Sequence, residues 1–188
     1  MRMGLWRRWQ TERAGRERAS AFVRALLVDP PESDVQQLAE IGTHGDADHA
    51  RWELRYVRRA TGMLAAQRDA LDDRTASLVS SALARAVRRD PRVATARRSV
   101  AARQFNIRLS AYADALEDKS ASERTGDRLG RVLLGFAGRL DPANTDLEAA
   151  GAIVTAFLSE ASEALRRSFG EAALPEDVAP SEMRSSGS

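Results

Sequence analysis

The stretch AIVTAFLSEASEALRRSF, residues 152–169, decides the fold class, because its apolar side chains recur at the spacing of an α-helix. Side chains three, four or seven residues apart lie on one face of a helix. The apolar set of this stretch is Ile153, Val154, Phe157, Leu158, Leu165 and Phe169. Such a stripe has to pack against other elements, so the stretch predicts a long amphipathic helix inside a bundle.

The same period extends over most of the remaining chain. There is no sustained alternation of apolar and polar residues, and aromatic residues make up only 5% of the sequence, so strands are not expected. We predict an all-α protein, a mainly antiparallel (up-down) bundle of about six long helices plus one short helix. The predicted helices span residues 4–28, 31–41, 47–70, 74–89, 92–117, 121–140 and 145–169. In the fifth, a wide apolar stripe is expected to face a partner helix; it consists of Val100, Ile107 and Ala111, flanked by Phe105, Leu109, Tyr112 and Leu116.

Three Asp-Pro pairs mark the expected corners between helices: Asp29-Pro30, Asp90-Pro91 and Asp141-Pro142. Aspartate accepts hydrogen bonds from the free amides of a helix start, and proline next to it loses nothing because its missing donor would be unpaired there. Two further pairs have the spacing of a capping box, Ser120 with Glu123 and Thr145 with Glu148. Asp46 is placed to cap the helix that begins at residue 47.

Length and composition indicate one domain and are compatible with a reducing compartment. A chain of 188 residues is near the size of a single domain, which we assign to residues 1–170. Residues 171–188 have no helical period and are rich in Pro, Ser, Glu and Ala, so we predict a disordered acidic tail there. The sequence has no cysteine and no apolar run long enough for a signal peptide or a membrane span. We therefore expect a cytoplasmic protein.

The charges are distributed unevenly in this arginine-rich chain. Residues 1–28 have a net charge of +5, residues 29–48 of −6, and residues 85–108, with eight arginines and one aspartate, of +7. One interpretation of the third segment is phosphate binding, to nucleic acid or lipid. The other is a solvated helix face whose arginines pair with the acidic segment. The candidate anion-binding residues are Arg88, Arg89, Arg92, Arg97, Arg98 and Arg103.

Residues 42–53, GTHGDADHARWE, contain both histidines of the chain and three carboxylates. His49 and Glu53 are four residues apart and share a helix face, so with His44 or Asp46 they offer the ligand types of a divalent-metal site. The alternative is a helix start in which Asp46 is only the cap. This alternative leaves Glu53 without a cationic partner on its own helix face.

The first ten residues, MRMGLWRRWQ, predict an interaction surface. Leu5, Trp6 and Trp9 share one arc of the expected helix, with arginines beside it. Packing against the bundle or a second copy of the chain is one interpretation, and docking on an anionic membrane surface is the other.

No further catalytic pattern is found, since the sequence has neither a Gly-x-Ser-x-Gly elbow nor a glycine-rich phosphate loop with its lysine. We therefore expect a non-catalytic helical interaction or adaptor protein that needs no cofactor. Its expected partner is another protein or a second copy of the chain. The alternatives are a binder of nucleic acid or lipid through residues 85–108 and the N-terminal helix, and a metal-dependent helical-bundle enzyme that uses residues 44–53.

Overall fold

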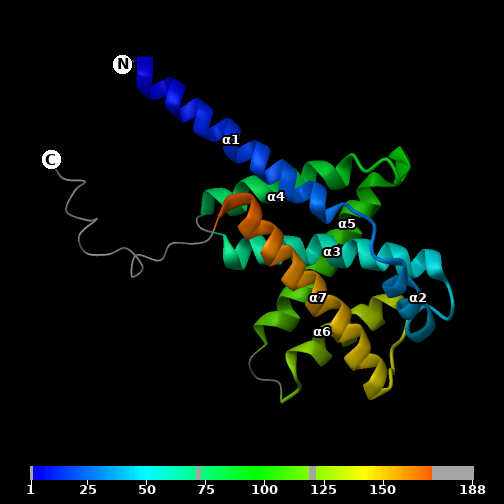
Figure 1. Ribbon diagram of the computed structural model, residues 1–188. Helices are drawn as coiled ribbons and strands as arrows, with labels where there is room; N and C mark the ends of the chain where they lie inside the picture. Colours follow the sequence, from blue (N-terminus) through cyan, green and yellow to red (C-terminus); the bar gives the residue numbers. More distant parts are fainter. Residues whose placement is uncertain (1, 71–72, 119–121, 171–188) are drawn as a thin grey trace.

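The structure, a computed structural model, describes residues 2–70, 73–118 and 122–170, and of residues 2–9 it gives the helix without the side chains. The described residues form seven α-helices and one 3₁₀ helix and contain no strand, which confirms the all-α helical bundle (Figure 1). The helices are α1 (Arg2–Leu26), α2 (Glu32–Ile41), α3 (Ala47–Asp69), α4 (Asp73–Arg88), η1 (Thr95–Arg97), α5 (Arg98–Glu117), α6 (Thr125–Ala137) and α7 (Asn144–Phe169). The antiparallel order of neighbours stays a prediction, and the predicted tail, residues 171–188, lies outside the described residues.

Helix α3 is the centre of the bundle, because it contacts each of the other α-helices. Every residue from Arg59 to Ala66 is buried. A helix that is covered on all sides needs small residues where neighbours approach, and Gly62 is one of them. A Cβ at Gly62 would lie 2.2 Å from Leu26 Cδ1, so the end of α1 rests on this glycine.

Helices α6 and α7 pack at close range through glycines. A Cβ at Gly130 would lie 2.3 Å from the carbonyl oxygen of Leu147, and a Cβ at Gly151 would lie 2.2 Å from that of Gly126. Both distances are shorter than any real carbon–oxygen contact, so the two backbones touch only because these positions lack a side chain.

The Asp-Pro pairs lie between helices, as predicted, but none of their aspartates caps the following helix. Helix α2 follows Pro31 and α7 follows Ala143, in both cases without a side-chain cap. Asp29 binds arginines instead, and Asp90 binds Arg59 with one oxygen and the backbone N–H of Arg92 with the other.

The two predicted capping boxes are also wrong. Helix α6 begins at Thr125 without a side-chain cap, which is later than Ser120 and Glu123 require, and Ser120 itself lies outside the described residues. Helix α7 begins at Asn144, so Thr145 lies inside it. The cap at Asp46 is confirmed, because its Oδ1 accepts the backbone N–H of His49 at 2.9 Å.

The fifth helix starts later than predicted. Asp90 Oδ1 accepts the backbone N–H of Arg92 at 3.0 Å, which closes a turn, and the 3₁₀ helix η1 precedes α5. The predicted apolar stripe is confirmed at Phe105 and Tyr112, which are buried. It is wrong at two positions, because Val100 is 54% exposed and Ile107 47% exposed. The buried side of α5 instead carries a charged residue at its middle, in the set Phe105, Arg108, Tyr112 and Ala115.

The C-terminal half of α1 packs on the bundle through Ala19, Phe22, Val23 and Leu26. Its N-terminal part extends beyond the other helices (Figure 1). None of the helices within the described ranges has both the length and the apolar character that a bilayer crossing requires.

Candidate functional site

The histidine-containing segment forms the turn before α3 and the first turn of that helix. His44 has a φ of 54° and is exposed in the turn, while the side chain of Asp46 caps α3. His49 Nε2 lies 3.5 Å from Glu53 Oε1, as their spacing predicts. In the described part of the chain, however, no three histidine, aspartate or glutamate side chains are close enough together to hold a metal ion.

Glu53 is buried, and its partner comes from another helix. Arg108 of α5 donates from Nε to Glu53 Oε2 at 2.7 Å and from Nη2 to Oε1 at 2.5 Å. Arg108 Nη1 also donates to Gln104 Oε1 at 2.6 Å. The guanidinium lies between two rings, with its Cζ 4.6 Å from the centroid of Tyr56 and 4.4 Å from that of Phe136. This two-bond pair therefore joins α3 to α5 and neutralises the glutamate that a metal would need.

A second buried ion pair joins α3 to the α4–α5 connection. The side chains of Arg59 and Asp90 are each 2% exposed, and Arg59 Nη2 donates to Asp90 Oδ2. Burial acts to raise the pKa of Asp90, but the Arg92 amide and the Arg59 guanidinium outweigh it and hold the pKa below its ordinary value. Asp90 is therefore a carboxylate in the folded protein, and it fixes the connection against the central helix.

The acidic segment 29–48 pairs with arginines, as one interpretation of the sequence predicted, but most of them belong to α3. Asp29 Oδ1 lies 2.9 Å from Arg55 Nε and 3.3 Å from Arg92 Nη2. Glu32 accepts from Arg51 at 3.0 Å. The hydrogen bond from Arg55 lowers the pKa of Asp29, so this pairing favours the ionised carboxylate.

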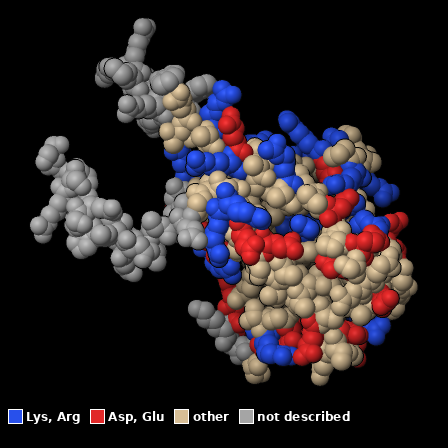
Figure 2. All heavy atoms as spheres, in the orientation of Figure 1, with Lys and Arg blue, Asp and Glu red and all other residues tan. Residues whose placement is uncertain are grey.

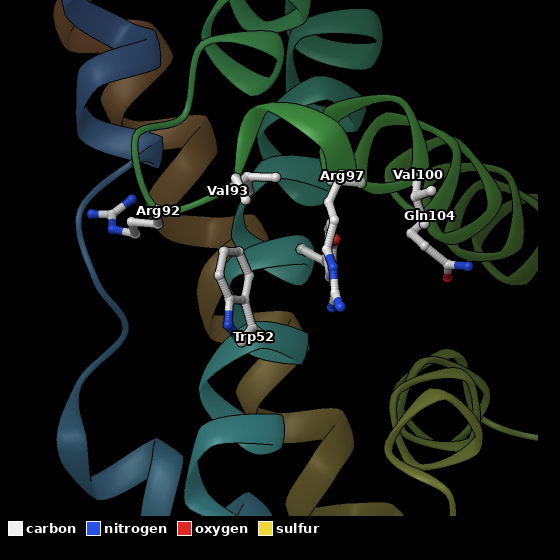
Figure 3. A pocket seen from close by; sticks show the side chains of 9 residues that line it. Trp52, Arg92, Val93, Arg97, Val100 and Gln104 are labelled. Atoms are coloured by element: carbon white, nitrogen blue, oxygen red, sulfur yellow. The ribbon is translucent and has the colours of Figure 1, made fainter.

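An open groove of about 450 Å³ lies between α3 and the α4–α5 connection. Figure 3 shows Trp52 rising from α3 toward the connection, with Arg92 to one side of the indole and Arg97 to the other. Arg55 Cζ lies 4.7 Å from the centroid of the Trp52 ring, so a guanidinium stacks on that ring. The lining residues are Trp52, Tyr56, Arg92, Val93, Ala94, Arg97, Val100, Ala101 and Gln104.

The six candidate anion-binding arginines are not equivalent. Arg92 is bound to Asp29 and to the carbonyl oxygen of Leu27, and Arg88 donates to the carbonyl oxygen of Ala84. The side chains of the other four make no ion pair or hydrogen bond with any described residue: Arg89, Arg97, Arg98 and Arg103. Figure 2 shows acidic and basic side chains interspersed over the visible face of the bundle.

Several of these site residues were not identified from the sequence. Trp52 and Tyr56 are four residues apart and share a helix face, which is a signal for an aromatic cluster but not for a groove. Glu53 gave a better signal, because no cation lies on its own helix face, which favours a partner from another helix. The interface candidates Leu5, Trp6 and Trp9 lie outside the side chains that the structure describes.

Comparison of the chain with protein-family models, curated proteins and solved structures gives no significant match.

Proposed function

We propose that this chain is a non-catalytic binding module that holds a short segment of a partner protein in the groove beside Trp52. The observation that carries the proposal is the combination of an indole in an open groove with an apolar side chain, Val100, that is 54% exposed next to it. Tryptophan is enriched at the centres of protein interfaces, where it supplies a large rigid contact area.

The walls of the groove are preorganised for binding. One wall is α3, the buried centre of the bundle, and the other is the connection that the Arg59–Asp90 pair fixes to α3. Rigid walls lower the entropy lost on association. The groove is also open at its sides, which suits an extended segment better than a small molecule, since small-molecule sites enclose most of their ligand.

The chemistry of the lining favours binding over catalysis. Among the nine lining residues the titratable side chains are Tyr56, Arg92 and Arg97. Burial raises the pKa of Tyr56, and arginine keeps its proton in proteins, so no lining residue accepts a proton near neutral pH.

Selection from a displayed library of random peptides tests this function. We expect the full chain to enrich peptides of about 12 residues, which span roughly 40 Å when extended. The same peptides should not be enriched by Trp52→Ala or by Val100→Asp, a change at a position that is 54% exposed. Leu140→Ala, at a position that is 89% exposed and away from the groove, is the matched control and should behave as the natural chain does. Equal enrichment by all four proteins would contradict the proposal.

A second candidate function is binding of an anionic polymer, and the unpaired guanidinium groups of Arg89, Arg97, Arg98 and Arg103 favour it. For duplex DNA the logarithm of the affinity should fall linearly with the logarithm of salt concentration, by about 0.9 for each phosphate contact. The double charge reversal Arg97→Glu with Arg98→Glu should weaken binding to every sequence alike. An affinity that changes neither with salt concentration nor with charge reversal would contradict the binding of an anionic polymer.

A further inference from the structure

The groove has two cations in its lining, of which Arg92 is paired with Asp29 and Asp90 and Arg97 is not compensated by its surroundings. Its lining includes Arg92 and Arg97 and no carboxylate. Three acids of the neighbouring elements are already bound, Asp29 by Arg55, Asp90 by Arg59 and Glu53 by Arg108. Arg97 is exposed and its side chain has no partner among the described residues. A ligand that brings a carboxylate to Arg97 therefore meets a free guanidinium.

An apolar strip continues from the groove along α5. Val100 and Ile107 are seven residues apart, so they lie on nearly the same side of the helix, and both are about half exposed at 54% and 47%. Ala111 continues this side by a further turn. Exposed aliphatic side chains in line with a groove favour a partner that is elongated and partly apolar.

We propose that the occupant of the groove is an acidic peptide segment with apolar anchors, which sets carboxylates against Arg97 and apolar side chains against Trp52 and Val100. This inference rests on the proposed binding function and names its partner class. Charge complementarity carries it: the free charge at the groove is positive, so an acidic segment gains both attraction and faster encounter. A second copy of the chain that inserts its N-terminal helix fits poorly, because residues 1–28 have a net charge of +5.

A single-stranded nucleic acid would also satisfy the arginines, but it fits the apolar features less well. Bases bind such proteins by stacking on open aromatic rings. Arg55 occupies one face of Trp52, and the Tyr56 ring lies 6.2 Å from it at a tilt of 39°. Phosphates and sugars also gain nothing from Val100 and Ile107. The peptide is therefore the favoured occupant, and an oligonucleotide serves as the competing probe.

The test uses the peptides that the displayed library yields on the full chain. We expect the enriched sequences to be rich in aspartate and glutamate, with an aromatic or leucine residue among them. The best of them, labelled with fluorescein, should bind with an affinity that Arg97→Glu lowers by about tenfold or more, as measured by fluorescence anisotropy. Arg18→Glu, which reverses an exposed arginine on α1 that does not line the groove, is the matched control and should change the affinity less than twofold.

A charge swap distinguishes the loss of the contact at Arg97 from a loss of the folded structure in Arg97→Glu. The same peptide with lysine in place of its acidic residues should bind Arg97→Glu more tightly than it binds the natural chain. Enriched peptides that are neutral or basic but still need Trp52 would overturn the acidic partner and leave the binding function standing. A thymidine oligonucleotide that binds more tightly than the best peptide, and depends equally on Arg97, would overturn it in favour of nucleic acid. No enrichment over Trp52→Ala would overturn both proposals.

Discussion

At the scale of single residues, two buried arginine–carboxylate pairs connect the central helix α3 to neighbouring elements. The side chains of Glu53 and Arg108 are 5% and 8% exposed, and those of Arg59 and Asp90 are 2% exposed. A buried pair costs desolvation that its attraction only partly offsets, so its net contribution to stability is small. Removal of one partner is different, because it leaves a buried charge without compensation.

We therefore expect Arg108→Met to lower the free energy of unfolding by about 3–5 kcal/mol. The double variant Glu53→Leu with Arg108→Met should recover much of that loss, since it leaves no unpaired charge. Arg103→Met, at an exposed position on the same helix, is the matched control and should stay within about 0.5 kcal/mol of the natural chain. Urea unfolding followed by circular dichroism gives all the values. A double variant whose free energy of unfolding is no higher than that of Arg108→Met alone would contradict this explanation.

The second pair predicts a dependence of stability on pH. The pKa of Asp90 is below its ordinary value in the folded protein, so the carboxylate form is the one that folding favours. Its contribution is fully present above the unfolded pKa of about 4 and is lost as the pH falls through the lower folded pKa.

The difference in unfolding free energy between the natural chain and Asp90→Asn should therefore be constant from neutral pH down to about pH 5 and shrink below about pH 4. Urea unfolding at a series of pH values measures it. Other acids such as Asp29 are common to both proteins and cancel in the difference. A difference that stays the same down to about pH 3 would show that the Asp90 carboxylate is not the stabilising form.

Sequence periodicity could predict the helices but only part of this residue-level chemistry. The Asp46 cap depends on neighbours within three residues, and it was predicted correctly. The pairs Glu53–Arg108 and Arg59–Asp90 link residues 55 and 31 positions apart, and periodicity alone does not show which helices meet. Two of the predicted caps failed for a related reason, because Asp29 and Asp90 bind arginines that only the fold brings near.

At the scale of elements, the contact between α6 and α7 depends on glycine. A side chain at Gly130 or Gly151 would meet backbone atoms of the partner helix, which cannot move aside as a side chain does. Gly135 also lies in α6, but a Cβ there would meet nothing within 4 Å. These positions thus allow the same substitution to be compared with and without a clash.

We expect Gly130→Ala and Gly151→Ala each to lower the free energy of unfolding by about 1–3 kcal/mol, because the helices must separate. Gly135→Ala should raise it by up to about 1 kcal/mol, since alanine favours the helix more than glycine does. Thermal and urea unfolding measure the three variants. A stabilising effect at Gly130 or Gly151 would contradict the close packing of α6 against α7.

The element that departs most from the sequence-based prediction, the α4–α5 connection, also forms a wall of the groove. The sequence predicts one helix from residue 92 with Val100 and Ile107 on its buried side. Because the turn at Asp90 and the 3₁₀ helix η1 come first, α5 begins at Arg98. The residue at the middle of its buried side is Arg108 and not an aliphatic residue. The exposed apolar strip is turned away from this buried side, and helical periodicity in the sequence does not show which of the two sides is buried.

At the scale of the whole molecule, the N-terminal part of α1 extends away from the bundle (Figure 1). We predict that Leu5, Trp6 and Trp9 make it an assembly surface. Light scattering should give the mass of a dimer for the intact chain and of a monomer for Trp6→Ala with Trp9→Ala, because truncated interface tryptophans cost a few kcal/mol of association. If the intact chain binds anionic vesicles and the double variant does not, the membrane interpretation is supported instead. If the intact chain is a monomer that does not bind the vesicles, and the substitutions do not change this, both the assembly and the membrane interpretation are contradicted.

The central claim is that the groove beside Trp52 is where a partner segment binds, and the fluorescence of Trp52 tests it most directly. In the full chain with Trp6→Phe and Trp9→Phe, Trp52 is the one remaining tryptophan. Titration with the best unlabelled peptide, chosen without tryptophan, should change the emission of Trp52 in a saturable way, at the same concentrations at which anisotropy reports binding. Arg97→Glu should shift both curves together to higher concentrations. Peptide binding by anisotropy that leaves the emission of Trp52 unchanged would place the partner elsewhere on the molecule and contradict the account.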